Sequence, residues 1–258
     1  MYFIIVKKMG VVVASISLFS TLSFGKSEIS QNELINIAGK QRMLSQRIAK
    51  DYLYIGRKIA TSKAQREFKE SMKNFLLAHK KLHNSIDDPE IKNLLDFVAL
   101  SSDDLKELAS KEFSLDNAQL ILDLSESMLE GSQYVFDSLQ KRLKIKESNI
   151  IAIATKQRML SQRIAKYYIS YQSGIKDKNT IDMMQETVKD FSKNLNVLMK
   201  NGSNSSKVNK KLAEIDKLWK IVHKFYNNIE KGGLPLIVFN STDKITKKMD
   251  EVTKMYLF

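Results

Sequence analysis

The sequence predicts an all-α fold made of two tandem up-down four-helix bundles, and three observations lead to this prediction. A thirteen-residue segment occurs twice with one difference, at residues 38–50 (AGKQRMLSQRIAK) and 154–166 (ATKQRMLSQRIAK). The offset of 116 residues is a normal domain size, so the chain of 258 residues is expected to contain a duplicated unit. Only 2 prolines and 9 glycines interrupt the chain, which favours long helices over a β-rich fold.

Breaks in the sequence divide each unit into four helices. We expect the helices of the first unit at residues 28–60, 62–84, 89–110 and 116–148. Those of the second are expected at 149–173, 179–200, 206–230 and 236–257. Ser27 or Ser30 can cap the first helix, and Asp88 before Pro89 is a favourable helix start, because proline at the first helical position wastes no hydrogen-bond donor. The expected domains are therefore residues 26–148 and 149–258, each a four-helix bundle.

The junction between the two units is expected to be helical. Between Asp116 and Gln172 only Gly131 interrupts the pattern, and residues 141–151 (KRLKIKESNII) contain no helix breaker. We therefore expect one long helix shared by both bundles. At about 1.5 Å per residue, the two copies of the repeated segment would then lie roughly 40 Å apart, too far for one chain to bring them together. The same offset continues into the last helices, where Ser125 matches Ser241.

The first 25 residues have the pattern of a secretory signal peptide. Lys7 and Lys8 precede the apolar run VVVASISLFSTLSF, and residues 23–25 form a small-residue cleavage site. The apolar run is short for a membrane-spanning helix, and an uncleaved anchor is the alternative to cleavage. In either case the rest of the chain is expected outside the cytoplasm, in the periplasm. No second apolar span follows.

The composition predicts a partner of negative charge. The formal net charge is +13 and the isoelectric point is about 9.6, which favours binding of anions. Nucleic acid, an anionic membrane surface and small anions all fit this sign, but export argues against nucleic acid. The chain has no cysteine, so its stability depends on packing and not on disulfides.

Residues 34–59, which contain the first copy of the repeated segment, have three faces when they are placed on a helix of 100° per residue. One face forms the expected bundle core, and includes Leu34, Ile37, Gln41, Leu44, Ile48, Ile55 and Ile59. A second face is basic and is expected to face solvent; it contains Lys40, Arg47, Lys50 and Lys58. The third face is a stripe of mostly small residues: Ala38, Arg42, Ser45, Ala49 and Tyr52, repeated as Ala154, Arg158, Ser161, Ala165 and Tyr168.

The small-residue stripe predicts close approach of another helix, from outside its own unit. An arginine within such a face is costly to bury unpaired, because it loses its hydration. A bound oxyanion would compensate, since the guanidinium group offers a planar fork of donors. Alternatively, the arginine is a surface residue paired with a nearby carboxylate. We take the anion interpretation as the leading one, with Arg42, Ser45 and Gln41 and their counterparts Arg158, Ser161 and Gln157 as candidate ligand-binding residues.

Other polar groups give weaker signals. His79 and His83 lie four residues apart, a spacing that can bind metal, but no third ligand is evident nearby and no metal site is expected. The sequence contains no Ser-His-Asp set and no phosphate-binding loop. We therefore expect neither an enzyme nor a cofactor.

The repeated segment, AGKQRMLSQRIAK with its second copy, resembles the PilJ-type N-terminal domain of type IV pilus methyl-accepting transducers. It is also similar to the P-box of extracytoplasmic nitrate and nitrite sensor kinases. In the nitrate sensors an arginine of the first helix from each of two protomers binds one nitrate across the dimer interface. The resemblance implies this role for Arg42 and Arg158. Gly39 matches the Ala-Gly start of the family's motif and Thr155 departs from it. The nitrate sensors lack the full sequence Gln-Arg-Met-Leu-Ser-Gln-Arg, so the resemblance does not imply which ligand binds.

Two functions remain open at this point. The leading one is an exported sensory module that binds a small, nitrate-like anion at helix–helix interfaces and communicates with a membrane-bound signalling partner. We expect it to act as a homodimer or with a membrane receptor partner, because the nitrate-sensor relatives continue into a membrane helix and a signalling module that this sequence does not show. The alternative is a structural or interaction protein of a pilus or receptor complex, with no small-molecule ligand and with the arginines paired to a partner's carboxylates.

Overall fold

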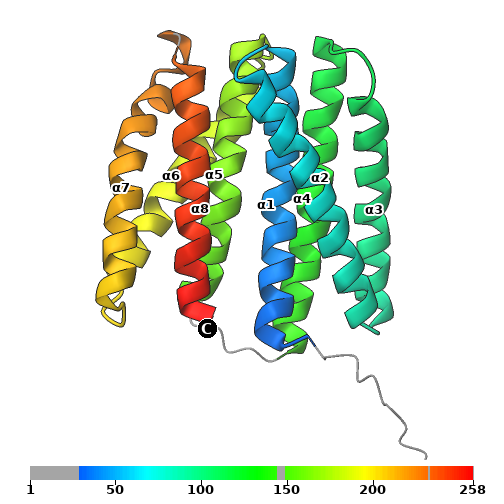
Figure 1. Cartoon of the computed structure of the whole chain (residues 1–258), viewed down its shortest axis with the longest axis vertical. Coiled ribbons are helices and arrows are strands. Elements are labelled where there is room, and N and C mark those ends of the chain that lie inside the picture. Colours follow the sequence, from blue (N-terminus) through cyan, green and yellow to red (C-terminus); the bar gives the residue numbers. More distant parts are fainter. Residues whose placement is uncertain (1–28, 144–148, 232, 258) are drawn as a thin grey trace, which may run out of the picture.

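The computed structural model describes residues 29–143, 149–231 and 233–257, and within these ranges it is built from α-helices without strands (Figure 1). The all-α prediction is confirmed. The predicted signal segment, residues 1–25, lies outside the described residues. None of the described helices is long and apolar enough to cross a membrane.

Two groups of four helices make up the chain. The first unit contains α1 (Gln31–Gly56), α2 (Thr61–Ser85), α3 (Pro89–Ala109) and α4 (Leu115–Arg142). The second contains α5 (Asn149–Ser173), α6 (Lys178–Met199), α7 (Ser206–Asn227) and α8 (Pro235–Leu257), with a short 3₁₀ turn at Ile229–Lys231. Within each unit the first helix packs against the second and fourth, and the third packs against the fourth.

Short polar side chains begin most of these helices, as the sequence indicates. The hydroxyl of Ser30 accepts a hydrogen bond from the backbone N–H of Glu33, and Ser114 caps α4 in the same way. The carboxylate of Asp88 accepts from two backbone N–H groups at the start of α3, immediately before Pro89. These caps satisfy donors that have no partner within the helix, and so they fix where the helices start.

The prediction of one long helix shared by both bundles is wrong, because the described residues before and after the junction belong to two helices that run in opposite directions (Figure 1). α4 ends at Arg142, where the backbone N–H of Leu143 closes the last turn on the Leu139 carbonyl, and a new helix begins at Asn149. The intervening residues 144–148 lie outside the described residues. Figure 1 shows α4 descending and α5 ascending, so that the two units lie side by side and not end to end.

The centre of the molecule is the contact between α1 and α5, the two helices that contain the repeated segment. They run in the same direction through the middle of the molecule (Figure 1). Gly39 of α1 faces Thr155 of α5, its counterpart in the repeat. A Cβ atom at Gly39 would overlap the Thr155 side chain and would lie 2.9 Å from Nη2 of Arg158. The absence of a side chain at Gly39 thus allows the two copies of the segment to pack directly against each other.

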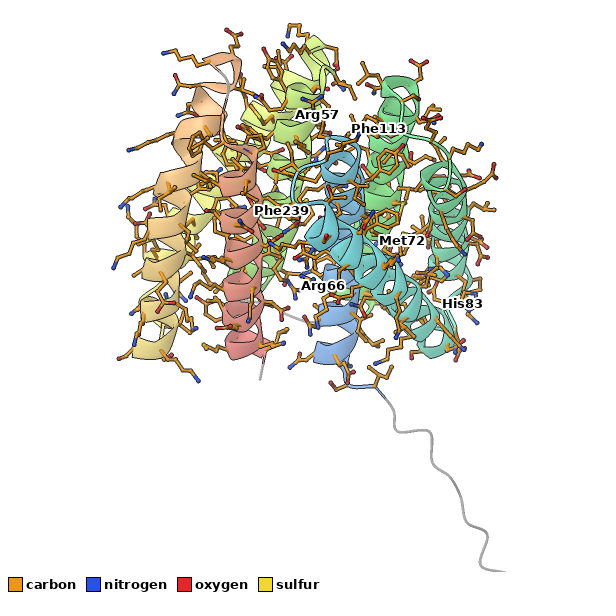
Figure 2. All side chains as sticks on the ribbon, turned by 45° about the horizontal axis from the view of Figure 1, so that its top comes forward. Arg57, Arg66, Met72, His83, Phe113 and Phe239 are labelled. Atoms are coloured by element: carbon orange, nitrogen blue, oxygen red, sulfur yellow. The ribbon has the colours of Figure 1, made fainter. Side chains whose placement is uncertain are left out.

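Aromatic side chains at the other end of α1 extend this junction. Phe239 of α8 points toward α1 (Figure 2), where its ring centroid is 4.4 Å from that of Tyr54. Phe113 packs against Tyr52 at 5.6 Å, in the loop before α4. Tyr54 is fully buried and its hydroxyl donates to the Pro235 carbonyl at 2.9 Å. The first helix of one unit is therefore tied to the fourth helix of the other.

Candidate functional site

The two motif arginines are both buried in the interior of the molecule, on the paired helices α1 and α5. Arg42 is 2% exposed and Arg158 is fully buried. The guanidinium of Arg42 stacks on the ring of Phe136, 3.6 Å from its centroid, and its Nη1 donates to the side-chain oxygen of Gln133 at 2.6 Å. Both partners lie on α4 of the same unit. A cation–π contact and an amide thus help to hold the guanidinium of Arg42 against α4.

Arg158 has a different set of partners. Its Nη1 donates to Oδ1 of Asp250 on α8 at 2.6 Å and to the amide oxygen of Asn36 on α1 at 3.0 Å. Nε and Nη2 of Arg158 have no hydrogen-bond partner among the described residues. Burial lowers the pKa of Arg158, and the neighbouring Asp250 opposes this shift. A carboxylate of the same chain therefore neutralises the second arginine.

The small-residue stripe packs within its own unit, which corrects the expectation of a partner from outside. The contacts of Arg42 with α4 establish this for the first unit. In the second unit the hydroxyl of Ser161 lies 2.6 Å from that of Thr246 on α8. The stripe therefore faces the fourth helix of its own bundle, and a different face of α1 and α5 joins the two units.

The remaining candidate ligand-binding residues are buried but are not gathered around the arginine side chains. Ser45 and Ser161 donate their hydroxyl hydrogens to the backbone carbonyls of Arg42 and Arg158, each at 2.8 Å. The amide of Gln157 donates to the Phe191 carbonyl on α6, and Gln41 is fully buried. These contacts satisfy or shield the helix backbone, as expected for polar side chains in a helix interior.

The basic face of α1, which the sequence predicts to face solvent, is largely buried in the structure. Lys50 and its counterpart Lys166 are fully buried, and the side chains of Arg47 and Arg163 are 24% and 16% exposed. Lys58 is exposed, as expected. A bundle standing alone would leave this face in water, but here the other unit covers it.

The first ion cluster joins α1 and α2 to α8. Lys50 lies 2.6 Å from Oδ1 of Asp243, and Lys63 lies 2.8 Å from Oδ2. Arg47 bonds Glu67 at 3.2 Å and lies 3.6 Å from Asp243. These cations hold the pKa of Asp243 well below its ordinary value, against the opposing effect of burial.

A further acid, Asp51, completes the first ion cluster. It is fully buried, and burial raises its pKa to about 7, although Lys50 lies only 3.2 Å away. Asp51 has no acidic counterpart in the second unit, where Tyr167 stands at the matching position. The two halves of the interface therefore differ in a titratable group.

The second ion cluster is the counterpart of the first, with the roles of the two units exchanged: α5 of the second unit pairs with α4 of the first. Arg163 and Lys166 of α5 both bond Glu126 of α4, and Lys166 also donates to Ser125 at 3.0 Å. Burial acts to raise the pKa of Glu126, but Lys166 and Arg163 together lower it to about 2. Burial lowers the pKa of Lys166 to about 8. Each copy of the segment thus reaches over to a carboxylate on the fourth helix of the other unit.

The pairing also corrects the register expected for the fourth helices. Arg47 and Arg163 are 116 positions apart, whereas their partners Asp243 and Glu126 are 117 apart. The partners of the motif arginines, Gln133 and Asp250, show the same spacing of 117. Glu126 and Asp243 are therefore structural counterparts, and the match of Ser125 with Ser241 is one residue out.

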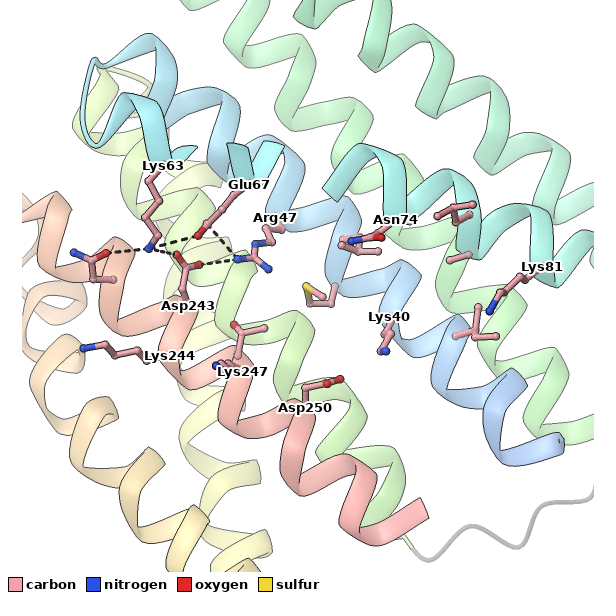
Figure 3. Close-up of a pocket in the computed structure, with 17 residues that line it drawn as sticks. Lys40, Arg47, Lys63, Glu67, Asn74, Lys81, Asp243, Lys244, Lys247 and Asp250 are labelled. Atoms are coloured by element: carbon pink, nitrogen blue, oxygen red, sulfur yellow. Dashed lines mark hydrogen bonds and ion pairs between the residues drawn. The ribbon is translucent and has the colours of Figure 1, made fainter. Parts of the chain in front are cut away.

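Two surface grooves lie on either side of the junction. The α2–α8 groove, of about 710 Å³, is lined by α1, α2 and α8, and includes Lys40, Arg47 and Asp243 (Figure 3). The α4–α6 groove, of about 870 Å³, is lined by α1, α4, α5 and α6, and includes Arg42 and Lys156. Arg42 can therefore be reached from a groove, whereas Arg158 lines neither of them.

The described residues contain no group of three or more His, Cys, Asp or Glu side chains arranged to hold a metal ion. The rings of His79 and His83 are tilted to each other with centroids 6.2 Å apart, and His83 lies 3.6 Å from Asp96. Burial and the neighbouring His83 lower the pKa of His79.

Comparison with known proteins assigns the family. The model described as "Type IV pili methyl-accepting chemotaxis transducer N-term" matches residues 26–110 and 145–243. The chain belongs to the PilJ family. The two matched segments correspond to the two helical units, so the PilJ-type region occurs here in tandem. This family comprises sensory regions of chemotaxis transducers. Searches among curated proteins and among solved structures gave no match.

Proposed function

We propose that this PilJ-type chain is an exported, periplasmic sensory module that binds a small, nitrate-like oxyanion at Arg42. The observation that carries the proposal is the position of Arg42, a charged guanidinium held by an aromatic ring and an amide at the wall of a groove. Buried arginines favour planar oxyanions, because a bidentate hydrogen-bonded pair compensates for the lost hydration. The family assignment supports the sensory role.

The two copies of the motif have different roles in this proposal. Asp250 already neutralises Arg158, so an anion there would have to displace a carboxylate at 2.6 Å. Arg42 has the anion-binding role in this proposal because it lines the α4–α6 groove, where an anion can reach it, and the same wall contains the basic side chains of Lys156 and Lys193. In this proposal the second unit takes the place of a second protomer, so that one chain supplies both central helices, α1 and α5. A homodimer is therefore not needed to complete this pair of helices.

Signalling requires that the anion favours one arrangement of the units over another. The junction of α1 and α5 with the crosswise ion clusters is the element that we expect to respond. An anion at Arg42 would change the charge balance beside α4, the helix that also carries Glu126. A membrane-bound signalling partner would detect the resulting shift.

Isothermal titration calorimetry with sodium nitrate and sodium nitrite, with sodium chloride as the reference salt, tests the proposal. Wild-type protein is expected to bind at least one of the oxyanions, and Arg42→Ala and the double variant Arg42→Ala/Arg158→Ala to lose the binding. Arg66→Ala is the matched control, because Arg66 lies on the exposed face of α2 (Figure 2). Arg42→Lys keeps the positive charge but lacks the planar fork of donors, so it should fold even if Arg42→Ala does not, and it should bind the anion more weakly than wild type. The absence of binding by wild type, or unchanged binding by folded Arg42→Ala, would refute the proposal.

A structural or interaction role without a small ligand is the second candidate. The pairing of Arg158 with Asp250 favours it, since this arginine is satisfied within the chain. The same titration separates the two candidates, because only the sensory proposal expects saturable heat that depends on Arg42.

A further inference from the structure

The α2–α8 groove carries more positive charge than its counterpart across the junction. Six basic side chains line it, against three acidic ones, Glu67, Asp243 and Asp250. In the α4–α6 groove four basic side chains stand against three acidic ones, Glu126, Glu130 and Asp137. The two grooves lie in equivalent positions, between the first two helices of one unit and the fourth helix of the other. The difference in charge between the two grooves therefore comes from their side chains and not from the arrangement of the helices.

Four of the six cations in the α2–α8 groove are not used by the fold. Arg47 and Lys63 belong to the ion cluster around Asp243. The ammonium groups of the other four have no ion pair or hydrogen bond within the described ranges; they are Lys40, Lys81, Lys244 and Lys247. All three acids of the groove are already paired, with Asp250 held by Arg158 and Lys254. The excess charge is thus available to a ligand.

Lys40 lies where an anion would be most strongly favoured. It is half-buried on α1, and Figure 3 shows it on the wall between Asn74 of α2 and Asp250 of α8. Burial lowers the pKa of Lys40, Asp250 opposes this effect, and the cations Arg158, Lys254 and Lys81 add to the lowering. A negative charge in the groove would relieve both the lost hydration and the repulsion between the cations.

The floor of the groove is apolar. Its apolar lining includes Ile37, Met43, Leu44, Leu77 and Ala78. Leu77 is 48% exposed, so its apolar surface is accessible from the groove. The volume of about 710 Å³ is within the range of small-molecule sites, which combine apolar walls with a few polar groups that fix orientation. An inorganic oxyanion would leave most of this space and the apolar floor unused.

We propose that the α2–α8 groove binds an organic acid, a small molecule with a carboxylate or equivalent anionic group and an apolar body. The anionic group lies between Lys40 on α1 and Lys247 on α8, and the apolar body lies on Met43 and Leu77. Because the walls come from both units, the ligand bridges them beside the Asp243 ion cluster. This site is separate from Arg42, which lines the opposite groove, and the proposal does not depend on nitrate binding there.

Calorimetric titration of the chain with sodium 3-phenylpropionate tests the proposal, with 3-phenylpropionamide as the uncharged analogue. The carboxylate is expected to bind saturably, and the amide about tenfold or more weakly, since the ion pairs account for at least about 1.4 kcal/mol. Lys40→Gln/Lys247→Gln is expected to weaken carboxylate binding by about tenfold or more. Lys193→Gln, in the α4–α6 groove, is the matched control and should leave it unchanged.

The outcomes distinguish this site from the proposed function. Arg42→Ala is expected to abolish the response to nitrate and to leave 3-phenylpropionate binding intact, and the double lysine variant is expected to do the reverse. Equal binding of the acid and the amide, loss of binding in Lys193→Gln, or no saturable binding of the acid would each overturn the proposal. Circular dichroism confirms that the variants fold, which is expected because both lysines have unpaired side-chain ammonium groups.

Discussion

Asp243→Asn is expected to destabilise the protein by about 3 kcal/mol, because it removes the carboxylate that joins α8 to the first unit. Lys50 is fully buried with its ammonium 2.6 Å from Asp243, so the substitution leaves a cation without its strongest partner and without water. Breaking a buried pair from one side typically costs about 3–5 kcal/mol. Asp51 at 3.2 Å and Glu67 at 3.9 Å remain near Lys50, which places the expected value at the low end of that range.

Urea unfolding followed by circular dichroism at pH 7 measures this loss, and the melting temperature should fall by roughly 6–12 °C for a chain of this size. Asp182→Asn is the control, since Asp182 pairs with Lys178 on the exposed surface of α6 and should contribute less than about 0.5 kcal/mol. Lys50→Met in the Asp243→Asn background should recover much of the loss, because it removes the stranded charge. A change of under about 0.5 kcal/mol in Asp243→Asn would refute the inter-unit ion cluster as a source of stability.

Three further predictions concern the junction. Gly39→Val is expected to destabilise the protein by about 1–3 kcal/mol through overlap with α5, whereas Gly202→Ala, with nothing within 4 Å, should have little effect; urea unfolding compares them. Wild type is expected to lose stability relative to Asp51→Asn as the pH rises from 3.8 to about 7. In this range the folded state of wild type holds a proton on the Asp51 carboxyl that the unfolded state has lost. The reverse applies to Glu126, whose pKa is lowered from 4.5 to about 2 in the folded state. Wild type should therefore lose stability as the pH falls from 4.5 to about 2, and Glu126→Gln should lose less. Unfolding at a series of pH values measures the effect of both substitutions. A pH profile of either variant parallel to that of wild type would contradict the assignment.

The helices and their starting points could be predicted from the sequence because local chemistry determines them. Ser30 and Asp88 cap helices as expected, since each side chain accepts hydrogen bonds from backbone N–H groups within three residues of itself. The breaks at Gly174 and at residues 201–205 likewise fall between described helices. These features require no knowledge of how distant parts of the chain meet.

The placement of the two units could not be predicted from the same patterns. A helical wheel separates the faces of α1 but does not say which helix covers each face. A charged face such as that of Lys50 and Arg47 usually lies in solvent, yet α8 of the other unit covers both residues. The signal that could have identified them is the repeat itself, because Lys50 and Lys166 are retained in both copies alongside Arg47 and Arg163.

The absence of a helix breaker in residues 141–151 does not by itself require a continuous helix. Ending α4 at Arg142 allows α1 and α5 to pack in register and buries both copies of the motif. Tertiary packing thus outweighs local helix propensity at this point. The one difference between the copies, Gly39 against Thr155, lies where the two helices pack directly against each other.

A disulfide between positions 39 and 155 tests most directly that the two copies face each other within one chain. A Cβ at position 39 would lie 3.6 Å from the Cβ of Thr155, close to the typical separation of about 3.8 Å across a disulfide. The chain has no cysteine of its own, so Gly39→Cys/Thr155→Cys has a single possible pairing within the molecule. Oxidation is expected to give an intrachain disulfide at monomer mass, detected by mass spectrometry of the linked peptides. Free thiols after oxidation, or cross-linked dimers alone, would contradict the side-by-side arrangement of the two units.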